Sequence, residues 1–339
     1  MIYFTGDVSL TDGYFNIGFG VGSKIARGEN PFKYITKELG DIWIGNFEGV
    51  ASTCSNQKEY ASKPFRINPN GLNIGSLFDY WGLANNHAMQ HGVVAYQQTI
   101  KALTDKGCQV FGSVERKSVS FEYKGQHVSV SALSLRVDEF CKEPCYWHCP
   151  ELTEIRQEIK NLPQDAFKVL FVHWGNEYIH RPSMAQKHLA HWLVDAGFDL
   201  IVGMHPHVLQ GYEDYKHARI YYSLGNFVFD MPSEACRYGA IVAFDFDKNG
   251  IPVFSERYVS IDKKGFPMVV GVDEIPSQYR FAQLNECLKK NDNSEPYHRE
   301  ALLGYYQYRK ANRLRILCQA FSHPQSILEV LSDFIKRKF

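Results

Sequence analysis

The sequence lacks an excess of charge of either sign. It contains 37 Lys and Arg residues and 37 Asp and Glu residues, so its formal net charge at pH 7 is zero. Domains that bind nucleic acid through bulk charge are strongly basic, and we therefore expect no nucleic-acid partner. Charged residues make up 22% of the chain and hydrophobic residues 45%, a balance that excludes global disorder.

Long hydrophobic runs and dense cysteine are also missing. No apolar run approaches the roughly 20 residues that cross a bilayer as a helix, so we expect no integral membrane segment. The residues that follow Met1 contain neither the basic cluster nor the apolar stretch of a secretory signal. The chain has 8 cysteines among 339 residues, which is too few for a disulfide scaffold. We predict a cytoplasmic protein with reduced thiols.

Short apolar runs alternate with amphipathic segments over the first two hundred residues or so. This alternation is typical of an α/β fold. Helices are predicted at 93–106, 151–160 and 184–196, and Asn30-Pro31 is predicted to begin another, with Asn30 as its cap.

The character of the sequence changes after residue 262. Strand signals fade there, apart from 268–270, and helices are predicted over 282–290, 297–318 and 325–336. We therefore divide the chain into an α/β domain, residues 1–262, and a helical C-terminal extension, residues 263–339.

Residues that bind metals or transfer protons follow several of the strand-like runs. They are Asp7, Glu48, Asn85, Asn86, His87, His173, His205, His207 and Asn226. Each residue type also has common structural roles, as a cap, a turn residue or a buried histidine. Because ligands bind beyond the carboxyl ends of strands in open α/β sheets, the recurrence at strand ends favours one shared site.

The candidate ligands include carboxylates, amides and imidazoles but no sulfur. This set favours Mn, Fe, Zn or Mg, and we expect one or two divalent ions. Two ions roughly 3.5–4 Å apart would activate water and hold a phosphoryl group for in-line attack. The turn 203–207 is the most specific element, because two histidines flank Pro206, and we expect Gly203 to let the backbone approach the ions.

Six motifs appear in the order found in a known protein family. They are Phe4-Thr5-Gly6-Asp7-Val8, Asn46-Phe47-Glu48-Gly49, Leu83-Ala84-Asn85-Asn86-His87-Ala88, His173-Trp174-Gly175-Asn176-Glu177-Tyr178, Gly203-Met204-His205-Pro206-His207-Val208 and Tyr222-Ser223-Leu224-Gly225-Asn226-Phe227-Val228-Phe229. Over roughly residues 1–235 the chain resembles the bacterial CapA family of capsule and poly-γ-glutamate biosynthesis proteins. That family looks like a branch of the calcineurin-like metallophosphoesterases, and the resemblance implies a four-layer αββα sandwich.

The resemblance also implies a role for each matching residue. The metal ligands would be Asp7, Glu48, Asn86, His173, His205 and His207, and His87 would contact the scissile phosphate. The chain departs from the superfamily at Ser9, which stands where an Asp-x-His motif has histidine, and at Glu48, which replaces aspartate. Gln90 stands where the CapA branch often has an acidic residue, so the partner of His87 stays open.

Further residues are candidates for binding substrate. Lys63 and Arg66 offer cations to an anionic substrate, and Trp174 and Glu177 follow His173 closely enough to line a pocket rim. The competing interpretations are a solvated loop for the first pair and ordinary packing for the second. Asn85 and Asn226 complete the substrate-binding set.

Two other segments allow both a functional and a structural interpretation. Cys141, Cys145, Cys149 and His148 lie close together, but their spacing matches no standard zinc motif, and we favour free thiols. The helix predicted over 297–318 carries basic and tyrosine residues, and a solvated face is favoured over a partner surface.

Three hypotheses for the function follow. The favoured one is a metal-dependent phosphoesterase or phosphatase in capsule or cell-surface polymer biosynthesis, acting on a small phosphorylated substrate or polymer precursor. In the second, the same metal site hydrolyses an amide such as a γ-glutamyl link, because a metal hydroxide also attacks carbonyl groups. In the third, the chain is a non-catalytic accessory subunit of a polymer-synthesis complex, which docks a partner protein through its C-terminal helices.

Overall fold

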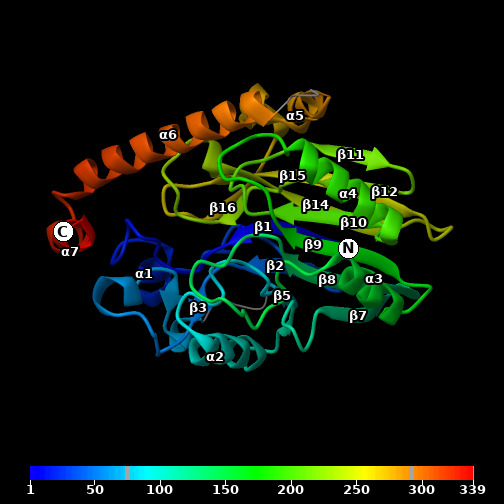
Figure 1. Ribbon diagram of the computed structural model, residues 1–339, viewed down its shortest axis with the longest axis horizontal. Helices are drawn as coiled ribbons and strands as arrows, with labels where there is room; N and C mark the ends of the chain where they lie inside the picture. The colour runs from blue at the N-terminus through cyan, green and yellow to red at the C-terminus, as the bar shows by residue number, and fades with distance from the viewer. Residues whose placement is uncertain (73–76, 290–293, 339) are drawn as a thin grey trace.

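The computed structural model describes residues 1–72, 77–289 and 294–338. Two β-sheets lie face to face at its centre (Figure 1). The first sheet has eight strands, with β13 (Asn226–Val228) paired to the end of β1. The spatial order of its other strands is β16 (Pro267–Val270), β15 (Pro252–Ile261), β14 (Tyr238–Phe246), β1 (Ile2–Val8), β2 (Ile42–Phe47), β5 (Tyr80–Gly82) and β6 (Gln109–Phe111).

The second sheet has six strands, of which β8, β9, β10 and β12 are parallel. Their spatial order is β11 (Tyr212–Tyr215), β12 (Ala218–Tyr221), β10 (Leu200–Met204), β9 (Phe167–His173), β8 (Gln126–Ser134) and β7 (Ser118–Tyr123). A small separate sheet joins β3 (Val50–Ala51) to β4 (Arg66–Ile67).

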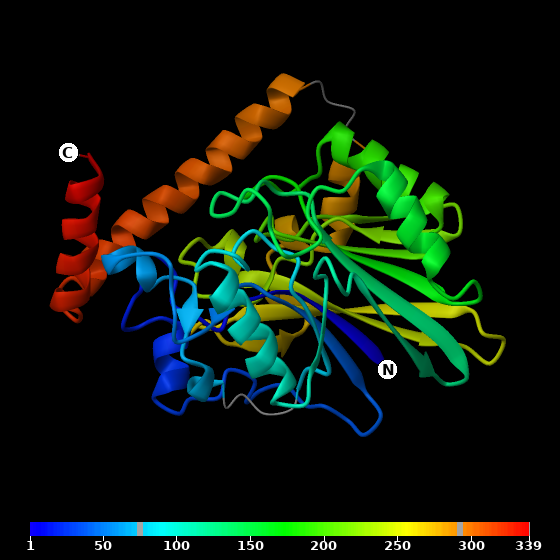
Figure 2. The ribbon, with the colours of Figure 1, turned by 60° about the horizontal axis from the view of Figure 1, so that its bottom comes forward.

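Helices cover the outer faces of both sheets (Figures 1 and 2). The second sheet carries α3 (Leu152–Asn161) and α4 (Met184–Ala196), and α2 (Val93–Thr104) packs beside β3 and β6 on the opposite side of the molecule. The layer order is helix, sheet, sheet, helix, which confirms the αββα sandwich. The shorter helices are α1 (Val21–Ala26), η1 (Glu59–Ser62), η2 (Pro69–Gly71), η3 (Ala235–Arg237), η4 (Val272–Glu274) and η5 (Ser277–Tyr279).

Alternating side chains of β9 separate two hydrophobic cores. Val169 and Phe171 point into the core between the sheets, whereas Leu170 and Val172 belong to the core beneath α3 and α4. Across the inner core, the rings of Phe4 and Phe171 lie 6.0 Å apart between centroids. Both faces of this strand are therefore buried, which explains why its sequence is a continuous apolar run.

Three helices follow the sheets: α5 (Phe281–Leu288), α6 (Ser294–Gln319) and α7 (Pro324–Lys338). They confirm the three helices predicted for this region, although Lys290, the last residue of the first prediction, lies outside the described residues. Figure 2 shows α6 running along one edge of the molecule towards α7. Because β16 continues the first sheet past residue 262, the C-terminal part joins the body through both a strand and helices; the division at residue 262 stays a prediction.

The prediction that a helix begins at Asn30-Pro31 is wrong. Residues 31–34 form a turn, in which Oδ1 of Asn30 accepts a hydrogen bond from the backbone N–H of Phe32 at 2.9 Å. Residues 33–41 are exposed or half-buried, so they have no buried apolar face that would stabilise a helix. The asparagine therefore caps a turn.

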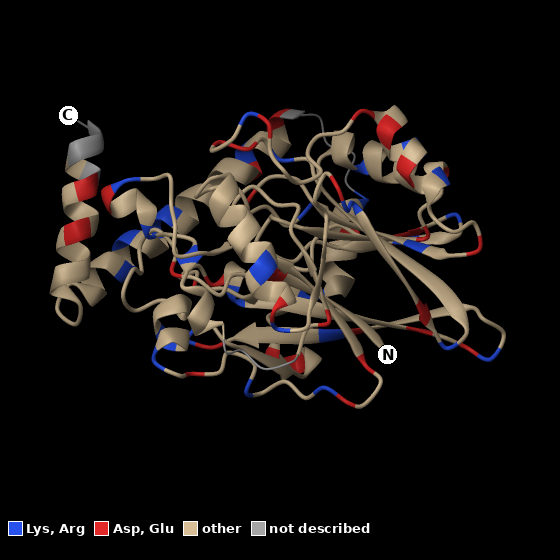
Figure 3. Ribbon diagram, turned by 90° about the horizontal axis from the view of Figure 1, so that it is seen from below, with Lys and Arg blue, Asp and Glu red and all other residues tan. Residues whose placement is uncertain are grey.

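Charge is distributed as the composition leads one to expect. Acidic and basic residues are mixed along the chain in the view of Figure 3. Among the helices formed by the described residues, none combines the length and the apolar character needed to cross a membrane.

The structure gives Gly203 a different role from the one that the sequence predicts. A Cβ atom there would lie 2.1 Å from the carbonyl oxygen of Tyr222 and 2.4 Å from Nε1 of Trp174. The absent side chain lets β10 pack closely against the backbone at Tyr222, and this packing places the turn that follows β10.

We expect Gly203→Ala to destabilise the fold by about 1–3 kcal/mol or more, because its Cβ would overlap backbone atoms that cannot move independently. Urea unfolding would measure the loss. Gly271→Ala is the matched control, since Gly271 has φ −69° and its Cβ would meet nothing closer than 3.6 Å. Equal stability of the two variants would contradict this explanation.

Candidate metal centre

The carboxyl ends of strands from both sheets meet at one buried point. Asp7 lies in β1, Glu48 follows β2, His173 ends β9, and His205 and His207 follow β10. All five side chains are buried. The fold therefore brings together residues that lie as much as two hundred positions apart in the sequence.

These residues form two groups of ligand atoms. Asp7, Glu48 and His173 each offer one atom within 4.8 Å of the others, and Glu177, His205 and His207 do the same. The groups are neighbours, because Nε2 of His207 lies 3.7 Å from Oε1 of Glu48. Such an arrangement has room for two adjacent cation positions.

The carboxylates lack the opposite charge that burial requires. Neither side-chain oxygen of Glu48 has a hydrogen-bond partner among the described residues. Burial, followed by the charge of Asp7, raises the pKa of Glu48 well above its usual value, and burial raises the pKa of Asp7. Buried charges are normally paired or bind metals. A divalent cation would supply the missing charge, so the donor set fits one.

The imidazoles are in the form that binds metals. Burial lowers the pKa of His173 and of His205 well below the usual value, so both rings are neutral near pH 7. Nε2 of His173 lies 2.8 Å from Oδ1 of Asn86 and 3.1 Å from Nδ1 of His205. Nε2 of His205 is buried without a hydrogen-bond partner among the described residues, and it is therefore a second ligand atom that lacks a partner.

Buried amides hold the ligands in place. Asn46 donates to Oδ1 of Asp7 at 2.8 Å, and Asn85 donates to Oδ1 of Asn46 at 3.0 Å. Oδ1 of Asn226 lies 2.9 Å from Nδ1 of His207, which assigns the proton of His207 to Nδ1 and leaves a lone pair on Nε2. Asn85 and Asn226, both predicted to bind substrate, are fully buried, and the structure places them behind the ligands.

His87 lies beside Glu48, at 3.8 Å between Nε2 and Oε1. Its Nδ1 is 2.7 Å from Oε1 of Gln90, an acceptor, so Nδ1 carries the proton. Gln90 is thus the hydrogen-bond partner of His87, which the sequence alone did not identify. Phe65 stacks on the ring at 3.7 Å between centroids, and burial lowers the pKa of His87 to about 4.

The backbone around the histidine pair is strained. His205 has φ +93° and His207 has φ +58°, and Tyr178, which contacts the same turn, has φ +63°. Side chains other than glycine rarely adopt this left-handed region. The N–H of Tyr178 donates to the carbonyl oxygen of Pro206 at 2.9 Å, so two strained segments stabilise each other at the site.

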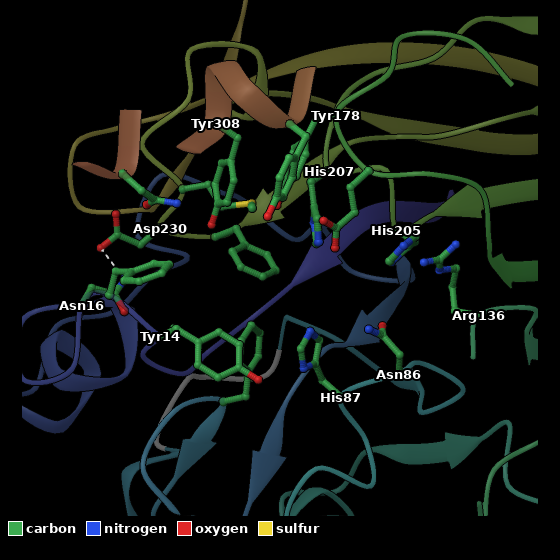
Figure 4. Close-up of a pocket in the computed structure, with 18 of the residues that line it drawn as sticks. Tyr14, Asn16, Asn86, His87, Arg136, Tyr178, His205, His207, Asp230 and Tyr308 are labelled. Carbon is green, nitrogen blue, oxygen red and sulfur yellow. Dashed lines mark hydrogen bonds between the residues drawn. The ribbon is translucent and has the colours of Figure 1, made fainter. Parts of the chain in front are cut away.

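A cavity of about 620 Å³ opens next to the ligands (Figure 4). Asn86, His87, His205 and His207 line one side of it, together with Glu177 and Arg136. Arg136 donates from Nη1 to the carbonyl oxygen of Gly175 at 2.8 Å. The ligand group of Glu177, His205 and His207 therefore borders a space that also contains a guanidinium group.

The motifs that form this site lie in a segment that matches a known protein family. A sequence model of the family described as bacterial capsule synthesis protein PGA_cap matches residues 1–231. The chain belongs to this family. It is 31% identical over 250 residues to "PGA biosynthesis protein CapA" of Bacillus subtilis (strain 168), with 69% of this chain and 65% of that protein covered.

The chain is also similar to a second curated protein and to a solved structure. The chain is 31% identical over 270 residues to "Capsule biosynthesis protein CapA" of Bacillus anthracis, covering 70% of this chain and 63% of that protein. It therefore spans slightly less than two thirds of the length of these curated PGA_cap relatives. A solved phosphatase structure from Mycoplasma pneumoniae is similar with a TM-score of 0.44 and 11% identity, covering 76% of this chain and 92% of that one.

Some predicted residues lie away from the cavity. The PGA_cap motif residue Trp174 packs in the core beneath α4 and donates to the carbonyl oxygen of Tyr222 at 2.9 Å. Lys63 pairs with Glu329 of α7 at 2.6 Å. Arg66 donates from Nε to the carbonyl oxygen of Ser62 at 2.7 Å. None of these three lines the cavity, because neighbouring groups already occupy their polar atoms.

Arg136 and Phe65 are among the cavity residues that the sequence analysis missed. Arg136 follows β8, so the strand-end pattern used for the other residues could have found it. Phe65 carries no such signal, because its stacking on His87 depends on the tertiary fold. The cysteine segment adds no ligand group within the described residues, and Nε2 of His148 lies 2.8 Å from the carbonyl oxygen of Arg136.

We expect Glu48→Gln to change the response of the fold to metal. In the presence of chelator near neutral pH, the variant should melt about 2–6 °C above the wild type, because the substitution removes one of two carboxylates that repel each other. With saturating Mn²⁺ the wild type should have the higher melting temperature, because the metal binds and stabilises it more strongly. Because the pKa of Glu48 is raised, ionisation of this carboxyl makes the metal-free fold less stable as pH rises above about 4.3, whereas the lowered pKa values of His173 and His205 act in the opposite direction.

Thermal melting with and without Mn²⁺ measures both effects. Glu122→Gln is the control, because Glu122 is exposed on β7. The same order of melting temperatures in both conditions would count against a metal at Glu48.

Proposed function

We propose that the protein is a metal-dependent phosphoesterase that acts on a small phosphorylated substrate in the biosynthesis of capsule or another cell-surface polymer. The observation that carries the proposal is the buried ligand cluster around Glu48, which adjoins His205 and His207 in the lining of a cavity that also contains Arg136. Membership of the PGA_cap family supports the biological context.

One or two divalent ions, of Mn, Fe, Zn or Mg, would be held in the buried cluster. Their ligands would be Asp7, Glu48, Asn86, His173, His205 and His207, with Glu177 within reach of the last two. When bound, such ions make water a nucleophile at neutral pH and neutralise charge on a phosphoryl group. Hydrolysis adds the water oxygen to phosphorus, breaks the ester P–O bond and transfers a proton to the leaving oxygen.

The residues of the cavity suit these steps. Arg136 presents a planar guanidinium group, which binds phosphate oxygens in pairs. His87, fixed by Gln90 and Phe65, lines the cavity with its ring. An anionic phosphate would raise the pKa of His87, so this ring is placed to hold the proton that the leaving oxygen needs.

We expect purified protein with Mn²⁺ to hydrolyse an aryl phosphate and His205→Ala to lose at least about 100-fold in kcat/KM, because a ligand atom is removed. A colorimetric assay with matched metal concentrations measures this loss. His217→Ala is the control, since the side chain of His217 is 54% exposed. Equal rates for His205→Ala and the wild type would overturn the proposal.

We expect Arg136→Ala to raise KM for a phosphate ester by about tenfold, with Arg136→Lys recovering part of the loss, because lysine keeps the charge but not the paired donors. Steady-state kinetics measure both constants. Arg313→Ala is the control, because Arg313 is exposed on α6. A fall in kcat with unchanged KM would contradict a role in binding phosphate.

Hydrolysis of a γ-glutamyl amide is the second candidate. A relative of this chain is called a PGA biosynthesis protein, and Arg136 could bind a glutamate carboxylate as well as a phosphate. Release of free glutamate from a γ-linked oligomer, with no phosphate released from any ester, would favour this reaction. A metal content below about 0.2 ion per chain would instead favour the accessory subunit.

A further inference from the structure

Helix α6 forms one wall of the cavity. Tyr305, Tyr308, Asn312 and Arg315 line it from this helix, opposite Tyr14 and beside Tyr178 (Figure 4). The match to the PGA_cap family ends at residue 231, so this wall comes from a part of the chain that the family match does not reach.

Contacts along its length fix α6 over the cavity. Gly304 packs so closely that a Cβ there would lie 2.2 Å from the carbonyl oxygen of Tyr178. One turn later, the rings of Tyr308 and Tyr178 stack at 4.3 Å between centroids and 14° between planes. Arg181 pairs with Glu300 at 2.7 Å. The wall is therefore fixed to the same segment that supports the histidine turn.

The far end of α6 is held by a buried ion pair. Arg315 lies 2.6 Å from Oδ2 of Asp230, and Asn16 donates to the same oxygen at 3.1 Å. The side chains of Arg315 and Asp230 are 13% and 12% exposed, so water screens this pair little. Nζ of Lys24 also lies 3.5 Å from this oxygen, so the carboxylate of Asp230 is already paired with cations of the chain.

The charges of the lining limit the ligand. The lining has two cationic side chains, Arg136 and Arg315, and three carboxylates, Glu139, Glu177 and Asp230. Arg315 is already paired with Asp230, so a single anionic group can bind at the Arg136 side, next to the metal ligands. We therefore expect the part of the ligand that lies along α6 to carry no negative charge.

The chemistry of the α6 wall indicates what that neutral part is. Tyr308 and Asn312 put a phenol hydroxyl and an amide beside aromatic surface. Burial raises the pKa of Tyr308 to about 12, so its hydroxyl keeps its proton, and Asn312 and Tyr178 are its hydrogen-bond partners in the protein. Sugars are recognised by this combination, in which C–H groups pack on aromatic rings and hydroxyls bond to planar polar groups.

We propose that Tyr308 and Asn312 bind the non-phosphate part of the substrate, a neutral hydroxyl-rich group such as a glycosyl unit, and thereby determine which phosphate esters the site accepts. This inference rests on the proposed phosphoesterase function. A nucleobase competes for the same surface, because it too packs on aromatic rings, and the relative rates for adenosine monophosphate and glucose 1-phosphate distinguish the two ligands.

The test compares two esters that differ only in the group facing α6. Phosphate release from glucose 1-phosphate and from methyl phosphate gives a ratio of kcat/KM values for each protein, all with Mn²⁺. Tyr308→Ala and Asn312→Ala should each lower this ratio about tenfold, since binding energy of the remote group is lost. Tyr308→Phe, which keeps the stacked ring, should lower it less and guards against detachment of α6.

The control is Tyr306→Ala, because Tyr306 is 62% exposed on the same helix and does not line the cavity. It should leave the ratio unchanged. An unchanged ratio in both Tyr308→Ala and Asn312→Ala would overturn the inference, as would a wild-type preference for adenosine monophosphate over glucose 1-phosphate.

Failure of the proposed reaction can be told apart from failure of this inference. If the wild type hydrolyses neither ester, calorimetric titration of the Mn²⁺-loaded protein with glucose 1-phosphate tests whether the α6 wall still binds this ligand. Binding that Tyr308→Ala weakens about tenfold, and Tyr306→Ala does not, would keep the α6 wall as a ligand site. Equal affinities in all three proteins, or no binding to the wild type, would overturn it.

Discussion

The uncompensated burial of Asp7 and Glu48 is the constraint on which the rest of the site depends. Two carboxylates share a region with almost no water, and the pKa of each is raised by that burial. Such an arrangement is unfavourable without an opposite charge. The neutral imidazoles of His173 and His205 cannot supply that charge, but they complete a ligand set for a cation that can. The burial and the residue types of the cluster are therefore those of a cation site.

The surrounding structure is arranged to keep the ligands in place before a metal binds. Amides rather than charged groups position them: Asn46 holds Asp7, Asn226 holds His207, and Gln90 holds His87. Amides orient a side chain without adding charge to a site that already has two carboxylates. The strained turn at His205 and His207 serves the same end, since packed sheets on both sides can offset a local cost of this size.

The cavity joins two parts of the chain with different origins in the sequence. The metal side comes from the segment that matches the PGA_cap family, and the opposite wall comes from α6. Arg136 lines the cavity beside the candidate metal ligands.

The sequence by itself determined the α/β class, the helices at 93–104 and 184–196, and the strand-end residues that converge, because strand periodicity and the carboxyl-end rule are local and topological properties. The false helix at Asn30 shows the limit of local signals, since a cap residue suits a turn equally well. Only the tertiary structure shows that Asn85 and Asn226 lie buried behind the candidate ligands, that Trp174 belongs to the core, that Gln90 and Phe65 contact His87, and that Tyr308 lines the cavity. Those roles depend on which surfaces meet across the two sheets and α6, and no spacing along the chain encodes such long-range contacts.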